Sequence, residues 1–170
     1  MPDPKASTVR WRDWGPALFV LAAVAIAYAN SLANGFARDD GAVIVLNDRI
    51  KDLTDFGAIW LAPYWPRDGG DWGLYRPLPI FGYAVQWALG SGTPVIFHAT
   101  SMLLHGAVTV LVLVLLRSLV EAPAALAGAL IFAVHPVATE AVANVVGQAE
   151  LLAALGIVGA CVLYGRRPEG

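Results

Sequence analysis

The chain alternates long apolar runs with short polar stretches, and the lengths of these runs predict membrane-spanning helices. A helix needs about 20 apolar residues to cross the hydrocarbon core of a bilayer. Residues 15–33, 94–119 and 147–165 form runs of this kind. A fourth run, residues 122–138, is shorter and reaches span length only by continuing past Pro136. The pattern therefore predicts about four transmembrane helices.

Residues 76–90 form a further apolar segment, which is amphipathic and marked by prolines, so it either crosses the membrane or lies at its surface. Basic residues discriminate between these options, because the cytoplasmic flanks of spans are enriched in Lys and Arg. If residues 76–90 do not cross, the basic flanks of the other spans all lie on one side of the membrane. These flanking residues are Lys5, Arg10, Arg12, Arg117, Arg166 and Arg167. We therefore predict four spans, both termini in the cytoplasm, and an outer loop over residues 34–93.

The predicted outer loop is rich in Trp and Tyr, whose amphipathic rings are enriched at membrane–water boundaries. The stretch LTDFGAIWLAPYW is typical of a short interfacial helix that Thr54 caps and that ends near Pro63. We therefore expect the loop to be ordered against the membrane. The aromatic residues concerned are Trp60, Tyr64, Trp65, Trp72 and Tyr75.

Composition agrees with this pattern. The 170 residues are 58% hydrophobic and 14% charged, with a mean hydropathy of +0.62, values that place the chain among membrane proteins. We predict an all-α, polytopic membrane bundle that forms a single domain over residues 1–170, with interfacial helices in the first outer loop. The sequence has no basic cluster of the kind that binds nucleic acid. The first apolar run is too long for a typical signal-peptide core, which favours a retained anchor.

Polar and charged residues gather where the predicted spans meet the outer side. An acid pair, Asp39 and Asp40, follows the first span. Arg76 precedes the second span and His135 closes the third. The next polar residues are Glu140, Asn144, Gln148 and Glu150, of which the first three are four residues apart and form one stripe on a continuous helix. Acids and an arginine that converge from separate helices are what a site requires.

A second polar stripe runs along the second span, where four residues fall within about 80° of one another on a helical wheel. These residues are His98, Ser101, His105 and Thr109. A charged side chain that faces lipid at this depth costs roughly 2.5–3.5 kcal/mol, so His105 is expected to face the bundle interior.

Each polar residue also has a structural interpretation. The two histidines would hydrogen-bond neighbouring helices, and Glu140 and Glu150 would be solvated loop acids. Arg76 would anchor the chain at the interface. The pair Asp39–Asp40 would interact with the dipole of a following helix.

Three stretches carry a resemblance to a known family. They are FARDDGAVIVLNDRIKDL, YRPLPIFGYAVQWALGSGTPVIFHATSMLLHGAVTVLVLVLL and ALIFAVHPVATEAVANVVGQAELLAAL. Together they resemble the N-terminal membrane part of the transmembrane and tetratricopeptide repeat-containing family. That family belongs to the GT-C superfamily of glycosyltransferases and is related to protein O-mannosyltransferases. The similarity covers residues 33–163, and the order of its motifs is more specific than any one of them.

The resemblance implies transfer of a sugar from a polyprenyl- or dolichyl-phosphate carrier to a protein or glycan hydroxyl on the non-cytoplasmic side. Asp39 and Asp40 match the family's acid motif, and one of them would act as general base. Arg76 matches an arginine suited to the carrier phosphate. Glu140 looks like a second catalytic acid. The other substrate-binding candidates are His135, Gln148, Glu150 and His105. A divalent cation is compatible with the superfamily, whose members differ in metal dependence.

The chain departs from the family in lacking further spans and repeats of about 34 residues, so we expect a fragment or a truncated relative. A non-catalytic membrane scaffold or assembly subunit would keep the same architecture without chemistry. A small transporter would use His98 and His105 as proton carriers, although we expect neither inverted repeats nor broken helices in the spans. The sequence has no long eukaryote-like loop or glycosylation sequon, which favours a bacterial inner membrane.

Overall fold

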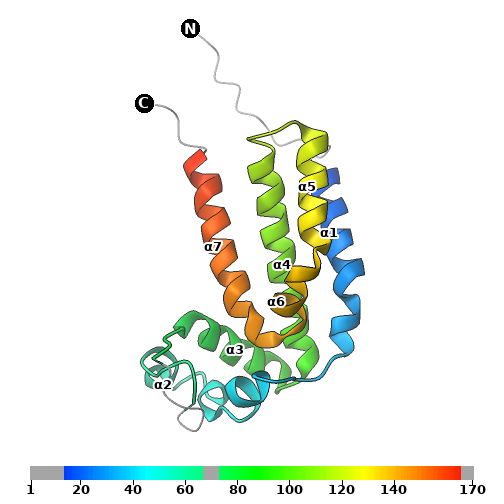
Figure 1. Ribbon diagram of the computed structural model, residues 1–170. Coiled ribbons are helices and arrows are strands. Elements are labelled where there is room, and N and C mark those ends of the chain that lie inside the picture. Colours follow the sequence, from blue (N-terminus) through cyan, green and yellow to red (C-terminus); the bar gives the residue numbers. More distant parts are fainter. Residues whose placement is uncertain (1–13, 67–72, 166–170) are drawn as a thin grey trace.

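Four helices run side by side as a bundle in the computed structural model of the chain, which describes residues 14–66 and 73–165 (Figure 1). The helices are α1 (Gly15–Tyr28, continued by the 3₁₀ turn η2, Ala29–Ala33), α4 (Pro94–Leu116), α5 (Ala122–Val134) and α7 (Gln148–Gly165). Helix α4 packs against α1, α5 and α7. All regular structure within the described residues is helical, which confirms the prediction of an all-α membrane bundle.

Three predicted spans are continuous in the structure, and one is broken. Gly15–Ala33, Pro94–Leu116 and Val145–Gly165 are long and apolar enough to cross a membrane. The remaining apolar segment divides at His135, and its two parts are bent by 43°. Pro136 lacks a backbone N–H and its ring clashes with a preceding helical turn, so α5 ends before it. The expectation of unbroken spans is therefore wrong for the third segment.

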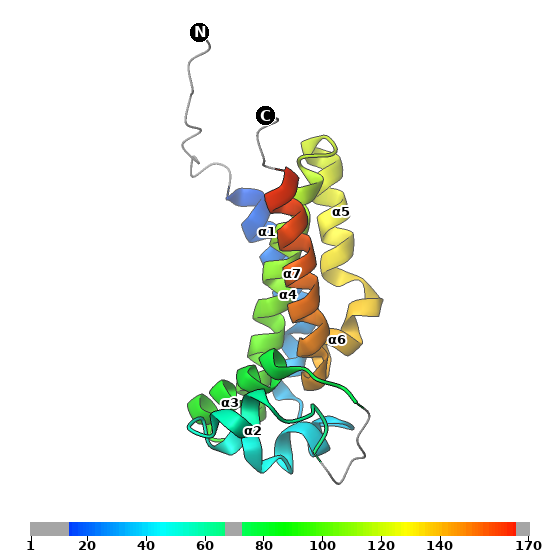
Figure 2. The same ribbon diagram turned by 90° about the vertical axis from the view of Figure 1, so that its left-hand side faces the viewer.

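Three short helical turns lead from this break to α7. They are η6 (Pro136–Ala138), α6 (Thr139–Ala143) and η7 (Val145–Gly147). They lie at the end of the bundle that faces the outer loop (Figure 2). The broken third segment thus brings residues from α6 and the start of α7 to that end.

Small side chains allow α5 to approach its neighbours closely. Ala125, Ala129 and Ala133 recur every four residues along α5, and all three are fully buried. Ala133 packs with residues of α1 and α4, and Ala125 and Ala129 pack against Val20 and Leu113 of the same two helices. Close approach of small residues is the usual basis of helix association in a bilayer, where the hydrophobic effect between helices is absent.

The polar stripe of α4 faces the interior of the bundle, where its costly groups find partners. His98, Ser101, His105 and Thr109 are all buried. Nε2 of His105 lies 3.0 Å from the carbonyl oxygen of Ala133, and Nε2 of His98 lies 3.3 Å from that of Gly35. The stripe therefore joins α4 to α5 and to the segment that follows α1.

The described part of the predicted outer loop forms a helical layer across one end of the bundle (Figures 1 and 2). We term it the outer layer after that prediction. Its elements are η3 (Gly41–Val45), η4 (Asp48–Lys51), α2 (Phe56–Trp60) and α3 (Pro77–Gly90). Val43, Ile44, Ile50, Ile59 and Tyr83 are among its buried core residues. With 14 residues, α3 is too short to cross a bilayer core of roughly 20 helical residues.

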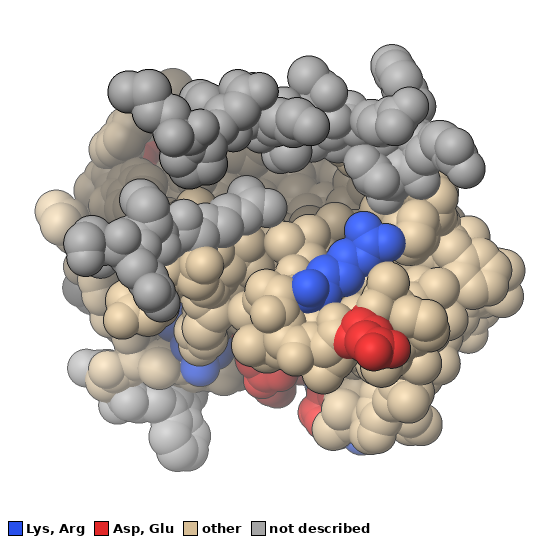
Figure 3. Space-filling model, turned by 90° about the horizontal axis from the view of Figure 1, so that it is seen from above, with Lys and Arg blue, Asp and Glu red and all other residues tan. Residues whose placement is uncertain are grey.

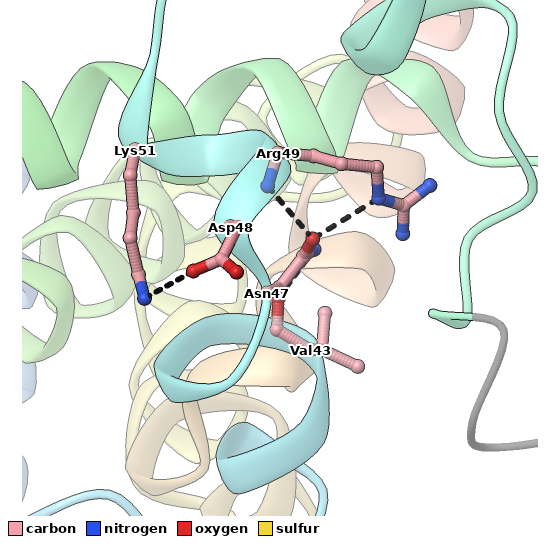
Figure 4. A network of polar contacts seen from close by, with 5 residues as sticks. All are labelled: Val43, Asn47, Asp48, Arg49 and Lys51. Atoms are coloured by element: carbon pink, nitrogen blue, oxygen red, sulfur yellow. Dashed lines mark hydrogen bonds and ion pairs between the residues drawn. The ribbon is translucent and has the colours of Figure 1, made fainter.

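A polar network holds the first half of the outer layer together (Figure 4). Nδ2 of the buried Asn47 donates to the carbonyl oxygen of Val43 at 2.9 Å, and Oδ1 of Asn47 accepts from Nε of Arg49 at 3.0 Å. Arg49 also donates to the carbonyl oxygens of Pro63 and Tyr64, at 2.7 and 3.2 Å. The network fixes the backbone position of Tyr64.

The predicted cap of α2 needs correction. Oδ1 of Asp55 accepts from the backbone N–H of Ala58 at 2.9 Å, which makes Asp55 the capping residue. The Thr54 hydroxyl instead donates to Asp52 at 2.6 Å. Asp55 directly precedes the helix, the position from which a side chain reaches the N–H groups of the first turn.

The opposite end of the bundle carries the start of α1, the α4–α5 connection and the end of α7 (Figure 1). Arg117 and Glu121 flank the α4–α5 connection and are exposed. Seen from this end, the described surface is mainly uncharged (Figure 3). The other basic residues used to predict topology, and Trp72 of the loop, lie outside the described residues.

Candidate functional site

A cavity of about 260 Å³ lies where the outer layer meets the bundle. Its lining comes from the turn after α1, the start of α3, α6 and the start of α7, which are far apart in the sequence. The lining includes Asp39, Tyr64, Arg76, Glu140, Asn144 and Glu150. Three predicted acids and the predicted arginine therefore share one hollow, which we term the acid–arginine cavity.

The adjacent residues Asp39 and Asp40 have different environments. Asp40 is fully buried. Its Oδ2 accepts from the N–H of Ala37 at 3.1 Å, and its Oδ1 accepts from the N–H of Val146 at 2.9 Å. Asp39 is exposed and lines the cavity. Asp40 therefore joins the turn that follows η2 to the segment before α7. Of the two adjacent acids, only Asp39 is accessible from the cavity.

Arg76 lies at the start of α3, and its guanidinium lies over the ring of Tyr64 at 5.4 Å from the centroid. Such a cation–π contact contributes about 0.5–2 kcal/mol, depending on how far it is desolvated. Burial raises the pKa of the Tyr64 phenol, so the ring stays neutral beneath the cation. Sequence reasoning treated Tyr64 only as an interfacial aromatic and missed this contact, because no local spacing links the two residues.

The helix that was expected to carry Glu140, Asn144 and Gln148 is interrupted, so that prediction of a single stripe is wrong. Asn144 has extended backbone angles, and α7 begins only at Gln148. A Cβ on Gly147 would lie 2.6 Å from the backbone of Ala141. This close approach admits only glycine. Glu140 and Asn144 still line the cavity, whereas Gln148 points elsewhere.

Gln148 is buried behind the cavity in a network that joins three helices. Its Nε2 donates to Oε1 of Gln86 at 3.0 Å, to the carbonyl oxygen of Phe97 at 3.0 Å and to Oγ of Ser101 at 3.2 Å. Nε2 of Gln86 donates in return to Oε1 of Gln148 at 2.9 Å. The amide thus fixes the start of α7, next to Gly147, against α3 and α4.

Neither of the two histidines proposed to bind substrate is among the residues that line this cavity. His135 is exposed, and its Nδ1 accepts from the N–H of Val137 at 3.2 Å, which caps the turn after α5. His105 lies between the rings of Tyr28 and Phe132 in the bundle. The structure gives both histidines a contact that holds the broken third segment in place.

An apolar groove of about 400 Å³ adjoins the acid–arginine cavity. It runs between the start of α3 and α7 and is lined by Pro77, Leu78, Leu152 and Ala153. Arg76 and Glu150 line both hollows. The two adjoining hollows therefore combine a charged part and an apolar part.

The described residues contain no group of three or more His, Cys, Asp or Glu side chains that could hold a metal ion. The acids of the cavity thus do not form a ready-made site for a divalent cation.

Taken together, the helices and the cavity define a polytopic membrane protein with a charged hollow at one end of its bundle. Three related proteins named protein O-mannosyl-transferase illustrate its relationships. Tmtc2 of Drosophila melanogaster is 35% identical over 152 residues, 86% of this chain and 16% of that protein. TMTC3 of Mus musculus is 31% identical over 148 residues, which are 85% of this chain and 16% of that protein. TMTC4 of Homo sapiens is 37% identical over 158 residues, which are 82% of this chain and 21% of that protein.

Over most of its length the chain is similar to these relatives, which supports its place in a transmembrane and tetratricopeptide repeat-containing (TMTC)-like family. It spans between 16% and 21% of the length of these three relatives. No family model matches the chain. No solved structure matches it either.

Proposed function

We propose that the chain is the donor- and base-bearing part of a glycosyltransferase. It takes a sugar from a polyprenyl or dolichyl phosphate and transfers it to a protein or glycan hydroxyl on the non-cytoplasmic side of the membrane. The observation that carries this proposal is the acid–arginine cavity, which joins Asp39, Arg76 and Glu140 from three separate segments. The names of the relatives support the same reaction class.

The carrier fits the two connected hollows. Arg76 offers a forked set of N–H donors to the phosphate, and its stacking on Tyr64 limits the orientations of the guanidinium. The polyprenyl chain lies in the apolar groove between α3 and α7. The sugar then occupies the acid–arginine cavity, where Glu140 and Glu150 accept hydrogen bonds from its hydroxyl groups.

Asp39 is the general base in this proposal. Its carboxylate takes the proton of the acceptor hydroxyl at about 2.6–3.2 Å, and the hydroxyl oxygen forms a bond to the anomeric carbon. The bond between that carbon and the phosphate oxygen breaks, and its electron pair leaves with the carrier phosphate. Arg76 stabilises the charge that grows on the phosphate.

The orientation of the chain follows from the same proposal. The outer layer faces the non-cytoplasmic side, and the end with the α4–α5 connection faces the cytoplasm, as expected for Arg117. Assignment to a bacterial inner membrane stays a prediction, and so does participation of a divalent cation.

Donor-dependent transfer by the full-length protein tests the proposal. Asp39→Asn is expected to lower kcat at least about 100-fold, within the range for loss of a general base. Arg76→Ala is expected to raise the KM for the lipid donor about tenfold, a loss of about 1.4 kcal/mol. Asp48→Asn is the control, since its exposed ion pair with Lys51 belongs to the outer layer and not to the cavity.

Undiminished transfer by Asp39→Asn would exclude the proposed base. If the full-length protein is folded but transfers no sugar, and the Asp39→Ala, Asp40→Ala double variant still complements a deletion strain, the chain is a non-catalytic scaffold.

A further inference from the structure

The guanidinium of Arg49 links its own turn of the outer layer to a loop that begins 14 residues further along the chain. Its Nε donates to Oδ1 of the buried Asn47, which fixes the plane of the guanidinium (Figure 4). Its two terminal nitrogens donate to consecutive carbonyl oxygens, Nη1 to that of Pro63 at 2.7 Å and Nη2 to that of Tyr64 at 3.2 Å. A rigid fork of N–H donors suits two neighbouring acceptors, whereas the single ammonium of a lysine has no such geometry.

The loop over residues 63–66 is the wall between two hollows. Trp65 and Pro66 line a hollow of about 520 Å³ on the side of Arg49, and Trp65 also lines the acid–arginine cavity. A wall with open volume on both sides makes fewer packing contacts than a buried segment, so hydrogen bonds contribute more to its position. The hydrogen bonds from Arg49 come from outside the loop and hold its first two residues.

Both backbone polar groups of Tyr64 are paired, and each pairing ties the loop to a different segment. The carbonyl oxygen accepts from Arg49, and the N–H donates to the carbonyl oxygen of Leu74 at 2.7 Å. Leu74 lies two residues before Arg76, so this second hydrogen bond brings the segment that leads into α3 to the loop. Tyr64 is only 2% exposed, and its ring lies beneath the guanidinium of Arg76.

The guanidinium of Arg76 depends on that ring for its orientation. Arg76 is exposed, and within residues 14–66 and 73–165 its side chain has no hydrogen bond or ion pair. An arginine side chain without a partner samples many rotamers, and ordering it on binding costs free energy. The contact with Tyr64 restricts this freedom before a ligand arrives. A chain of contacts therefore runs from Arg49 through Tyr64 to Arg76.

We infer that Arg49 is a positioning residue for the lipid-phosphate donor, because it holds Tyr64 and, through the Tyr64 ring, the guanidinium of Arg76. This inference rests on the proposed function, in which Arg76 binds the carrier phosphate. Arg49 is not among the residues that line the acid–arginine cavity, so it acts on the donor only through the other two side chains. Loss of this restraint weakens donor binding and leaves the proposed base, and therefore kcat, in place.

Two substitutions of Arg49 in the full-length protein test the inference. Arg49→Lys keeps the positive charge and loses the fork of donors, and Arg49→Gln loses both. The matched control is Lys51→Gln, which removes a nearby cation that pairs with Asp48 and lies over the ring of Trp87, away from Tyr64. The measurements are KM and kcat for the lipid donor and the Kd for polyprenyl monophosphate. Melting temperatures establish that each variant is folded.

Both Arg49 variants should raise the KM and the Kd about two- to fivefold and change kcat less than twofold, and the control should match the wild type. Arg49→Gln combined with Tyr64→Leu should bind no more weakly than Tyr64→Leu alone, because both changes act through one contact. Multiplicative effects in the double variant would overturn the inference. So would wild-type binding by Arg49→Lys, or a lower melting temperature with an unchanged KM. If Arg49→Gln does not fold, the KM of Arg49→Lys decides.

Failure of the proposed function gives a different result. A protein that transfers no sugar but shows the same pattern of Kd values for polyprenyl monophosphate keeps the positioning role and loses the chemistry. A protein that transfers sugar with a wild-type KM in both Arg49 variants keeps the chemistry and loses the positioning role. A protein that neither transfers sugar nor binds polyprenyl monophosphate contradicts both.

Discussion

Polar side chains differ in their hydrogen bonding between the interior of the bundle and the acid–arginine cavity. In the bundle, Gln148, Ser101 and His105 are buried and each is hydrogen-bonded to another segment or to its own helix. In the cavity, the carboxylates of Asp39 and Glu140 have no hydrogen-bond or ion-pair partner among the described residues. The paired groups join helices of the bundle, whereas these two carboxylates are open to the cavity.

The adjacent residues Asp39 and Asp40 differ in the same way. Asp40 belongs with the paired groups, because both of its oxygens accept backbone N–H groups. Asp39 belongs with the unpaired groups of the cavity. Substitutions should therefore separate the two regions by what they damage, stability in one case and chemistry in the other.

The largest effect on stability is expected for Asp40→Ala. The change leaves the N–H groups of Ala37 and Val146 unpaired, at about 1–3 kcal/mol each. We expect a loss of about 2–4 kcal/mol in the free energy of unfolding, measured by denaturation in detergent micelles. Asp39→Ala should change this free energy by less than about 0.5 kcal/mol, as is usual for surface positions. Equal losses in both variants would contradict the division between them.

Gly147→Ala should have a somewhat smaller effect. The new Cβ would lie 2.6 Å from the Ala141 backbone, which cannot rotate away, so we expect a loss of about 1–3 kcal/mol, as for other overpacked sites. Gly156→Ala on α7 is the matched control, because its Cβ would meet nothing within 4 Å. The control should be neutral or slightly stabilising, since alanine favours helix. Equal melting temperatures of the two variants would disprove close packing at Gly147.

The reciprocal amide pair Gln86–Gln148 should show coupling. A double-mutant cycle with Gln86→Leu and Gln148→Leu is expected to give an interaction energy of about 0.5–2 kcal/mol, because the two side chains contact directly. Unfolding free energies of the four proteins measure it. Strictly additive losses would show that the amides act separately.

The smallest effect is expected at Tyr64, which lies beneath Arg76. Tyr64→Leu removes the cation–π contact, worth about 0.5–1 kcal/mol at an exposed site, so the KM for the lipid donor should rise about two- to fivefold. Tyr64→Phe keeps the ring and should retain the wild-type value. An equal rise in the KM of the Tyr64→Phe and Tyr64→Leu variants would mean that the hydroxyl group of Tyr64, and not its ring face, contributes to donor binding.

The course of the helices was predictable because it depends on local pattern. The apolar runs predicted the positions of α1, α4 and α7 to within a few residues. The prediction that the polar stripe of α4 faces the interior is also confirmed. The break near residue 144 was not predictable. The four-residue spacing of Glu140, Asn144 and Gln148 suits a continuous helix, whereas the backbone is extended at Asn144 and brings Gly147 close to the backbone of Ala141.

The gathering of Asp39, Arg76 and Glu140 followed from placing their segments on one side of the membrane. The different environments of Asp39 and Asp40 did not, because they depend on the N–H of Val146, a partner 106 residues away. Likewise, nothing in the sequence near Tyr64 indicates that it lies under Arg76. The periodicity of apolar residues carries no information about tertiary partners of this kind.

The hydrogen bond between Asp40 and Val146 has a consequence for biosynthesis. The ribosome adds about 5–20 residues per second, so the stretch that closes the hollow emerges roughly 5–20 s after the acid pair. During this interval the newly made carboxylates have no completed pocket around them. The acid–arginine cavity is therefore complete only once residue 146, at the start of the fourth membrane segment, has been made.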